Sequence, residues 1–439
     1  MPRKAVALVA AVAILLAVCA DTTIADASVG SETTSAPAEV DDTYALDYTG
    51  GNAGPADEAL EPVVIGYINQ EGSVPSFPEA TVGIEAAVRY VNEELGGAGG
   101  HPVELAKCIV QSEEDGQRCG TEMANNDDVR FVIVGQLAVG GAVIYSILED
   151  KKPVLIGSVS GTDDLFAADA YSFTAGGPGV IAAMAIFIGT GLSDVDQVAV
   201  VFADNPGGRG ATEGFLQPLL EANGIDDVTL VPVADTATAP DLVAAIQAAG
   251  GLEADVLVPF VTLPGCIAAY DALQSLGIDP IVVATGLCFG QAMTEHLTDL
   301  GSDDQVPDGW YFGDFGESMF VPNEESGMAT AIEVLQEYEG PDVEYTGFAS
   351  ALFANLLTSV RFINQIGVDN LTSDAMREAI TSFEGPMMTI AGPMECGFSG
   401  TFPSLCGQRA GISQYVDGEW VLTAEHDEAI DVSTALGGT

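Results

Sequence analysis

The chain has 439 residues, which is long enough for two or three compact domains. Since 48% of the residues are hydrophobic, the composition excludes an intrinsically disordered protein. Its 12 lysine and arginine residues face 65 aspartate and glutamate residues, and the formal net charge of −53 argues against nucleic acid as a partner, because phosphates would be repelled. We interpret this charge as typical of a protein that works outside the cytoplasm in a saline medium, where salt screens the repulsion.

The first residues have the pattern of an export signal. A basic pair, Arg3 and Lys4, precedes an apolar run over residues 5–18, which is too short to span a bilayer. We therefore predict a signal peptide over residues 1–20 and an extracytoplasmic protein.

Two endings of this signal are consistent with the sequence. The segment 16–19 resembles a bacterial lipobox, in which Cys19 would be lipidated and would anchor the protein to the outer face of the cell membrane. The alternative is ordinary cleavage after Ala20, which would give a secreted or periplasmic protein. In both cases we expect residues 21–60, which are acidic and poor in large apolar side chains, to form a disordered tether.

The rest of the chain alternates continuous apolar runs of strand length with helical patterns. A first series predicts strands at 63–68, 103–110, 130–135 and 153–156, with helices at 79–95 and from about residues 140 and 163. A second series predicts strands at 197–202, 228–233, 255–259 and 280–284, with helices at 211–223, 239–249 and 265–276. Buried strands separated by helices are typical of parallel sheets covered on both faces. We therefore predict an α/β fold of two doubly wound lobes, with a ligand cleft between them beyond the carboxyl ends of the strands.

The sequence lacks the motifs of common catalytic and cofactor sites. It contains neither a Gly-x-Ser-x-Gly elbow nor a Walker-type phosphate loop, and we interpret His101, His296 and His426 as solvated surface residues. No Cys/His spacing indicates zinc. We therefore expect a protein that is not an enzyme and that holds no cofactor and no metal.

The cysteines suggest disulfides. If Cys19 is lipidated or removed, six cysteines remain, and six in an exported chain suggest three disulfides. They fall into three local clusters, so we pair nearest neighbours, although the sequence alone does not exclude the other connectivities. The expected pairs are Cys108 with Cys119, Cys266 with Cys288, and Cys396 with Cys406.

The loop at 135–141 runs from a predicted strand into a predicted helix. Backbone N–H groups around Gln136, Val139 and Gly140 would point free into the cleft and would form a natural site for a carboxylate. The alternative is that the glycines of this loop serve close packing.

The next loop, at 157–162, carries three hydroxyls. Those of Ser158, Ser160 and Thr162 would bind ligand, or they would only cap the helix that follows. The sequence leaves both interpretations open.

Several pieces of the chain from 61 to 424 together resemble a known family. They are the opening strand and helix at 64–66 and 82–92, the loops at 134–137 and 152–158, the segment 202–214, the cysteines at 266 and 288, and the closing strands at 411–420. Their order and spacing resemble those of extracytoplasmic solute-binding proteins of the leucine/isoleucine/valine type, which feed ABC importers. The resemblance implies a periplasmic-binding-protein type I fold, in which two lobes joined by three crossover strands close on the ligand by hinge motion.

The resemblance also implies boundaries, a function and partners. It assigns residues 61–175 and 290–405 to lobe 1, residues 176–289 and 406–424 to lobe 2, and residues 425–439 to a tail. The implied function is capture of a small polar solute (an amino acid, amide or small carboxylate) and its delivery to the permease of an ABC importer, by a monomer that meets the membrane only through a lipid anchor. The alternative is a sensor module of the same fold that acts in signalling.

The ligand residues that the resemblance implies come from both lobes. In lobe 1 they are Gln70, Gln136, Val139, Gly140, Ser158, Ser160 and Thr162, and in lobe 2 they are Arg209, Phe260 and Thr262. Relatives hold an amino acid's ammonium group with an acidic residue, and Gly265 stands at the matching position. This departure argues against a zwitterionic amino acid, because its ammonium group would be desolvated without a partner.

Arg209 is one of the few cations of the chain and follows a predicted strand of lobe 2. A guanidinium in the cleft would favour a negative or neutral polar group on the ligand, and Arg209→Ala would then weaken binding roughly tenfold to a hundredfold. If Arg209 is a surface residue that only relieves the acidic field, the same substitution would change the affinity less than about twofold.

Overall fold

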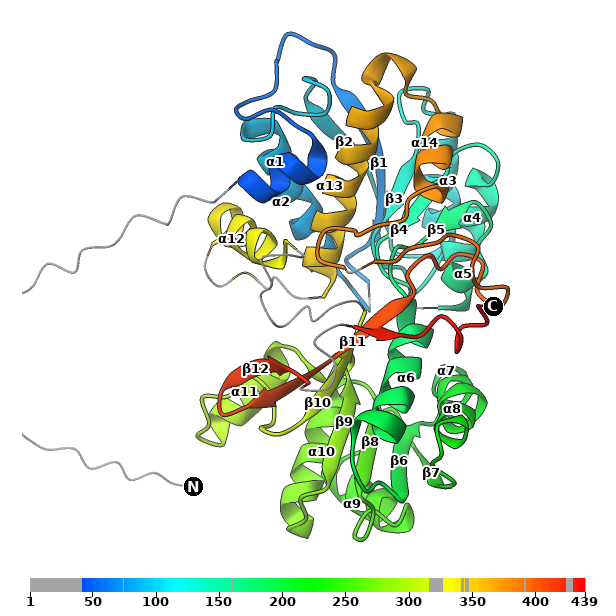
Figure 1. The fold of residues 1–439 in the computed structure, drawn as a ribbon, viewed down its shortest axis with the longest axis vertical. Coiled ribbons are helices and arrows are strands. Elements are labelled where there is room, and N and C mark those ends of the chain that lie inside the picture. The colour runs from blue at the N-terminus through cyan, green and yellow to red at the C-terminus, as the bar shows by residue number, and fades with distance from the viewer. Residues whose placement is uncertain are drawn as a thin grey trace, which may run out of the picture. The chain divides into compact units, whose positions relative to one another are not determined.

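The computed structural model describes residues 42–73, 75–159, 161–315, 327–340, 343, 347–390, 392–423 and 429–438. These residues form two β-sheets, each with helices packed on it (Figure 1). The predicted signal peptide, Cys19 and Ser160 lie outside the described residues.

Lobe 1 contains a parallel sheet of five strands in the order β2-β1-β3-β4-β5. The strands are β1 (Val63–Gln70), β2 (Val103–Val110), β3 (Val132–Val134), β4 (Val154–Ile156) and β5 (Ala170–Tyr171). The helices of this lobe are α1 (Thr43–Thr49), α2 (Pro78–Glu93), α3 (Glu113–Asn125), α4 (Gly141–Leu148), α5 (Thr162–Leu165), α12 (Met328–Glu339), α13 (Phe348–Ile366) and α14 (Ser373–Thr381), and Val368–Asn370 forms a 3-10 turn.

Alternate side chains of β1 enter two different hydrophobic cores. Ile65 and Tyr67 pack with α2 and α13, whereas Ile68 packs on the other face with α3 and α4. Helix α2 approaches α13 closely, because a side chain at Gly83 would collide with the backbone of Ala349. Burial on both faces explains why the strands of this sheet are continuous apolar runs.

Lobe 2 contains a mixed sheet in the order β12-β11-β10-β9-β8-β6-β7, with β13 beside β11. The strands are β6 (Gln197–Ala203), β7 (Asp227–Val233), β8 (Val256–Phe260), β9 (Ile281–Thr285), β10 (Tyr311–Asp314), β11 (Arg409–Val416), β12 (Glu419–Leu422) and β13 (Ile430–Asp431). The helices are α6 (Gly176–Ile186), α7 (Pro206–Ala211), α8 (Gln217–Ala222), α9 (Ala239–Ala248), α10 (Leu263–Leu276) and α11 (Gln291–Asp299), with π-helical turns at Phe187–Gly191 and Thr212–Leu216 and a 3-10 turn, η3, at Gly286–Cys288. Strands β6 to β10 are parallel, and β11 pairs antiparallel with β10, β12 and β13.

The two-lobed α/β architecture predicted from the sequence is confirmed. The chain builds the first sheet up to β5, passes to the second sheet for β6 to β10, returns to lobe 1 for α12 to α14, and passes back to lobe 2 for β11. It therefore crosses between the lobes three times, as the resemblance implied.

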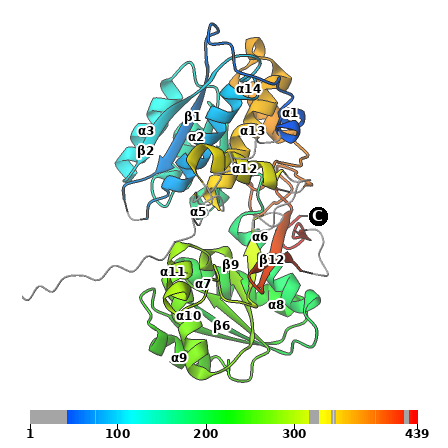
Figure 2. The same cartoon turned by 90° about the vertical axis from the view of Figure 1, so that its left-hand side faces the viewer.

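The boundary expected at residue 289 is wrong. Strand β10 is in register with β9, and α11 packs beside α10 in lobe 2, which both views show (Figures 1 and 2). The chain thus leaves lobe 2 only after Asp314. The expected tail is also partly wrong, because β13 pairs with β11 and Val432 is fully buried.

The second half of the expected tether is ordered. Helix α1 packs on α13, where the Tyr48 hydroxyl lies 2.8 Å from that of Thr358 and the Arg361 guanidinium lies over the Tyr48 ring at 4.9 Å. Burial, opposed in part by a hydrogen bond to Thr358, raises the pKa of Tyr48. The Tyr90 hydroxyl donates to Asp42 at 2.7 Å. An acidic segment can dock in this way because a few tyrosines supply the apolar contact that its composition lacks.

The disulfides of the structure are the three nearest-neighbour pairs. Cys108 bonds to Cys119, Cys266 to Cys288, and Cys396 to Cys406. Each bond lies within one lobe and closes a short loop of the chain. Cys266 belongs to α10 and Cys288 to η3, so this bond fixes the turn that follows β9.

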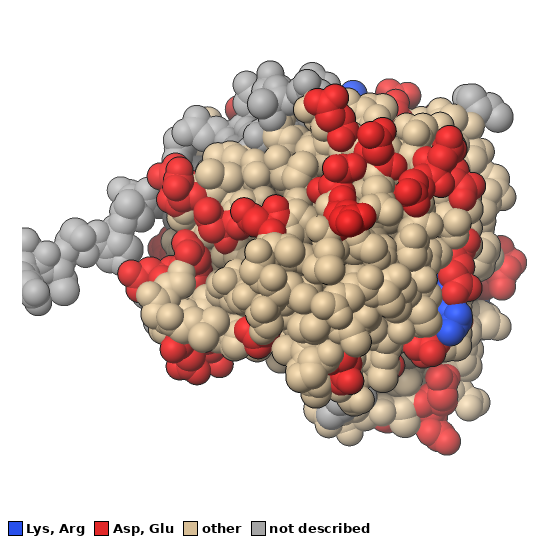
Figure 3. Space-filling model, turned by 90° about the horizontal axis from the view of Figure 1, so that it is seen from below, with Lys and Arg blue, Asp and Glu red and all other residues tan. Residues whose placement is uncertain are grey.

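Acidic side chains outnumber basic ones on the surface that Figure 3 shows. Figure 3 shows them scattered over one face, with few basic side chains among them. Several cations are already engaged with carboxylates, namely Arg89, Lys107, Arg118, Arg209 and Arg377. The excess negative charge thus faces solvent, where salt can screen it.

Candidate functional site

The carboxyl ends of β1, β3 and β4 meet at one edge of the lobe 1 sheet, because these strands are parallel. Gln70 ends β1 and is 1% exposed. Its Oε1 accepts from the N–H groups of Ala138 at 2.7 Å and Val139 at 3.1 Å, and its Nε2 donates to the carbonyl oxygen of Pro75 at 2.8 Å. The side chain of Gln70 therefore joins the loop after β1 to the loop after β3.

Other N–H groups of the loop after β3 have acceptors as well. The N–H of Gln136 donates to Asn69 Oδ1 at 3.0 Å. At the start of α4, the N–H groups of Gly140 and Ala142 donate to carboxylate oxygens of Glu113 (3.1 Å) and Asp163 (3.2 Å). The expectation that this loop offers free N–H groups to a ligand carboxylate is wrong, because the protein's own side chains occupy them.

The alternative interpretation of the glycines is confirmed. Gly140 has a φ of 78°, and a side chain there would meet the Cα of Gly116 at 3.0 Å. A side chain at Gly116 would in turn meet the Cα of Gly140 at 2.7 Å. The two glycines thus allow α3 to pack against the start of α4.

Gln136 differs from its neighbours in the loop. The residue is 5% exposed, and its Oε1 has no hydrogen-bond partner among the described residues. A buried acceptor without a donor costs free energy, so such atoms are rare in folded proteins. Gln136 is therefore the predicted lobe 1 residue whose side chain retains the capacity to accept a hydrogen bond from a solute.

The loop after β4 is only partly described. Ser158 is buried and Thr162 is exposed at the start of α5. The N–H of Gly161 donates to Asp164 Oδ2 at 3.1 Å, and the Tyr145 hydroxyl donates to Asp164 Oδ1 at 2.6 Å. Burial, and then the carboxylate of Asp164, raise the pKa of Tyr145 well above its usual value. Asp164 thus organises the start of α5, and the ligand role of the three hydroxyls stays a prediction.

The matching edge of lobe 2 is formed by the carboxyl ends of the parallel strands β6 to β10. Phe260 ends β8 and is partly buried, and Thr262 is the exposed residue before α10. Thr285 ends β9, is 7% exposed, and its Oγ1 has no partner among the described residues. Leu287 follows in η3 with 60% of its surface exposed. Sequence reasoning missed Thr285 and Leu287, although their position directly after a buried strand could have identified them.

Arg209 lies in α7, after the carboxyl end of β6. Its guanidinium pairs with Asp204 at 2.6 Å and with Glu213 at 2.7 Å, and its side chain is 44% exposed. Hydrogen bonding to Asp204 and the charges of both carboxylates raise the pKa of Arg209. The Arg209 guanidinium is thus paired with the carboxylates of Asp204 and Glu213, and the three side chains together carry a net negative charge.

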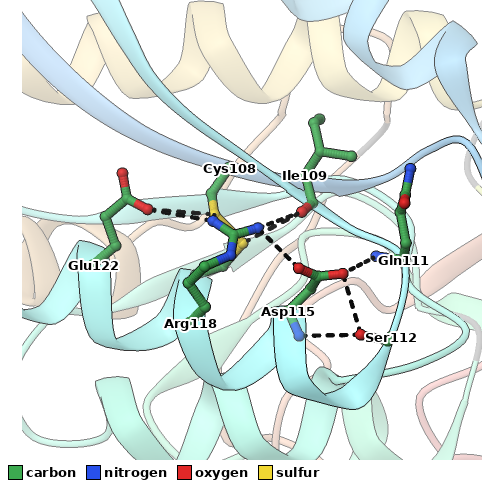
Figure 4. A network of polar contacts seen from close by, with 8 residues as sticks. Cys108, Ile109, Gln111, Ser112, Asp115, Arg118 and Glu122 are labelled. Carbon is green, nitrogen blue, oxygen red and sulfur yellow. Dashed lines mark hydrogen bonds and ion pairs between the residues drawn. A yellow bond between two sulfur atoms is a disulfide. The ribbon is translucent and has the colours of Figure 1, made fainter.

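A second polar network lies at the carboxyl end of β2, on α3 (Figure 4). The Arg118 guanidinium contacts Cys108 Sγ at 2.9 Å and donates to the carbonyl oxygen of Ile109 at 3.0 Å and to Asp115 at 3.1 Å. Asp115 Oδ2 in turn accepts from the N–H of Gln111 at 3.2 Å. These contacts hold α3 against the end of β2, and we interpret them as structural.

Two absences concern only the residues that the structure describes. Among them, no helix combines the length and apolar character needed to cross a membrane. In the same ranges, His, Cys, Asp and Glu residues form no cluster that could hold a metal ion.

Comparison with known proteins assigns the family. The model of the periplasmic binding protein family matches residues 62–396, so this chain belongs to that family. No curated protein matches the chain.

Solved structures share the fold at low sequence identity. A substrate-binding protein of an ABC transporter from Desulfitobacterium hafniense, in complex with leucine, has 16% identity and a TM-score of 0.63 over 82% of this chain and 100% of that chain. A leucine-binding protein from Thermotoga maritima has 14% identity and a TM-score of 0.62 over 84% of this chain and 99% of its own. A fatty acid ABC transporter substrate-binding protein from Thermomonospora curvata has 14% identity and a TM-score of 0.66 over 89% and 98%.

Proposed function

We propose that this chain is the solute-binding component of an ABC importer, which captures a small solute outside the cytoplasm and delivers it to the permease subunits. The observation that carries the proposal is the family match over residues 62–396, which spans both lobes. The similar structures that bind leucine or belong to a fatty acid transporter support the same role.

The geometry of the two sheets supports solute capture. In parallel α/β sheets, ligands bind beyond the carboxyl ends of the strands. Each lobe has a buried polar atom there that finds no partner in the described part of the chain, Gln136 Oε1 in lobe 1 and Thr285 Oγ1 in lobe 2. A solute held by both lobes would draw them together, so we expect a smaller radius of gyration in small-angle scattering when solute is bound.

Location and assembly are part of the proposal. Export by the signal at 1–20, a lipid anchor at Cys19 and a monomeric state would place one solute-binding domain beside each permease. Labelling with radioactive palmitate tests the anchor, and its loss in a Cys19→Ala variant is the expected result.

The function is tested by two measurements on the full chain. Native mass spectrometry of gently purified protein should show a retained small molecule or binding of one from a mixture of solutes. Deletion of the gene should then abolish uptake of that molecule by the cells. Retained uptake after deletion would contradict a role in transport and would favour the sensor module.

A further inference from the structure

We propose that the solute is neutral and mainly apolar, and that it donates a hydrogen bond to Gln136 Oε1 while its apolar part lies against Leu287 and Phe260. This inference rests on the proposed function and deepens it. Aliphatic primary amides and alcohols have this chemistry, whereas free carboxylates and zwitterionic amino acids do not.

The first argument is that lobe 1 opposes a carboxylate. The N–H groups of Ala138 and Val139, which could bind an anion, are already held by Gln70 Oε1. The start of α4 is occupied by the carboxylates of Glu113 and Asp163. A ligand carboxylate would have to displace these groups and would meet two like charges beside the same helix, which disfavours its ionised form.

The second argument is that lobe 1 offers an acceptor. The Oε1 atom of Gln136 is buried and has no donor among the described residues. A solute N–H or O–H group that reached this atom would satisfy it, and a solute without a donor would leave it unpaired. An acceptor at this place selects a donating group and discriminates against carboxylates, which only accept.

The third argument is that two of the five parallel strands of lobe 2, β8 and β9, end in segments without charge. The segments 256–265 and 281–290 contain no Asp, Glu, Lys or Arg. Leu287 is 60% exposed at the second of these ends, although the neighbouring Cys288 is fully buried and disulfide-bonded. An apolar part of a solute can cover Leu287 and Phe260. The neighbouring strand β10 ends in the buried Asp314, whose Oδ1 already accepts from the N–H of Phe315 at 2.6 Å.

The cations near this edge do not alter the conclusion. Arg209 is the basic residue of the segment after β6, and Asp204 and Glu213 already neutralise it. An anionic solute would therefore compete with two carboxylates for one guanidinium.

Isothermal titration calorimetry with paired probes tests the inference. Butanamide, hexanamide and octanamide are titrated into the purified full chain beside butanoate, hexanoate, octanoate and L-leucine. We expect at least one amide to bind roughly tenfold more tightly than its carboxylate and than leucine, since a mismatched polar group in a built site costs at least this factor. Tighter binding of leucine or of a carboxylate, or binding of no amide, would overturn the inference.

Two variants of lobe 2 test whether the apolar part of the solute lies against Leu287. Leu287→Asp should weaken amide binding roughly tenfold or more, because it places a charge in the apolar site. The matched control is Leu252→Asp, because Leu252 is 52% exposed in the turn before β8, at the opposite edge of the same sheet, and its replacement should leave the affinity unchanged. Equal effects of the two variants would contradict the placement.

Gln136→Leu tests the acceptor. It should weaken binding of the amide roughly tenfold without weakening binding of an alkane-like probe such as hexane. A retained solute that proves to be an anion or a zwitterion would overturn this inference and still support solute capture. A protein that neither retains nor binds any small molecule would count against the proposed function itself.

Discussion

The carboxyl edges of the two sheets hold their loops in different ways. In lobe 1, the loops after β1 and β3 are joined by hydrogen bonds from a buried side chain, that of Gln70, to two backbone N–H groups. In lobe 2, the turn after β9 is held to α10 by the disulfide between Cys266 and Cys288, and an exposed leucine lies beside it.

The loops at each carboxyl edge must be held in place and must also contact the solute, and the two lobes meet these requirements with different groups. At its carboxyl edge, lobe 1 uses polar groups to hold its own loops, and Gln136 Oε1 remains there as a buried acceptor without a partner among the described residues, so this edge sets the polar requirement for a solute. In lobe 2, a disulfide holds the turn after β9. Polar side chains are therefore not needed to hold this turn, and the exposed side chains around it can be apolar. We therefore expect substitutions at the carboxyl edge of lobe 1 and at that of lobe 2 to differ in their effects on the free energy of unfolding and on solute affinity.

The largest effect is expected from removal of the disulfide in lobe 2. A variant with Cys266→Ala and Cys288→Ala opens a loop with a sequence separation of 22 residues. It should lower the free energy of unfolding by about 3 kcal/mol, because the unfolded chain gains conformational entropy. Urea denaturation measures this change, with a Cys396→Ala, Cys406→Ala variant as the control. We expect a similar loss of stability in both variants and weaker amide binding only in the first, because only the first disulfide holds the turn that carries Leu287.

Gln70→Ala should have the next largest effect. It removes the buried side chain that accepts from two partly buried N–H groups, and it should lower the free energy of unfolding by about 2 kcal/mol. The control is Gln111→Ala, since Gln111 is exposed after the end of β2, and its effect should stay within about 0.5 kcal/mol.

The same variant also tests whether Gln70 excludes carboxylates from lobe 1. By releasing the N–H groups of Ala138 and Val139, Gln70→Ala should allow lobe 1 to bind a carboxylate that the wild-type protein rejects. Calorimetry with hexanoate tests this. Equal rejection by both proteins would show that Gln70 does not exclude carboxylates.

A smaller effect is expected at the opposite edge of lobe 2. The N–H groups of Gln197 and then Asp196 donate to Asp255 and lower its pKa. A carboxyl group with a lowered pKa stabilises the fold above its unfolded pKa of about 3.9, and this contribution is lost as the pH falls through the lower pKa of the folded state. Asp255→Asn should therefore flatten the loss of stability between about pH 4 and pH 2, by up to about 1 kcal/mol, without changing solute affinity. Thermal melts across this pH range measure the slope, and an unchanged slope would contradict the assignment.

The smallest effect is expected from Arg209→Ala. Its ion pairs are exposed, so the free energy of unfolding should change by less than about 0.5 kcal/mol, and the affinity for a neutral solute should change less than about twofold. Titrations at low and high salt measure the affinity. A tenfold loss would show that the guanidinium leaves its two carboxylates to hold the solute.

Much of the fold could be predicted because its strands are buried on both faces. The run at 197–202 falls within β6, and that at 103–110 coincides with β2. The boundary at residue 289 could not be predicted, because nothing local in residues 311–314 tells which of two sheets the strand will join. Helix α1 was missed because its acidic composition outweighed Tyr44 and Tyr48, whose contacts lie about three hundred residues further along the chain.

The site could be predicted in position but not in chemistry. Gln136 was predicted from its loop after a strand, and Gln70 and Phe260 were implied by the family resemblance; the structure places all three at the carboxyl edges. The sequence could not show that Gln70 consumes the N–H groups of residues 138 and 139, since this contact spans 68 and 69 positions. A backbone N–H group is available to a ligand only if no acceptor of the protein reaches it in the folded structure. The sequence alone does not show which acceptors do so.

The docking of α1 has a mechanical consequence. A force applied to the chain at residue 42 would strain the contacts of Tyr48 with Thr358 and Arg361 before it strained β1. Helix α1 can detach, and the segment up to residue 62 can unwind, while the five-stranded sheet keeps all of its strands. We therefore expect the segment before β1 to yield first under force, so that the five-stranded sheet keeps its hydrogen bonds.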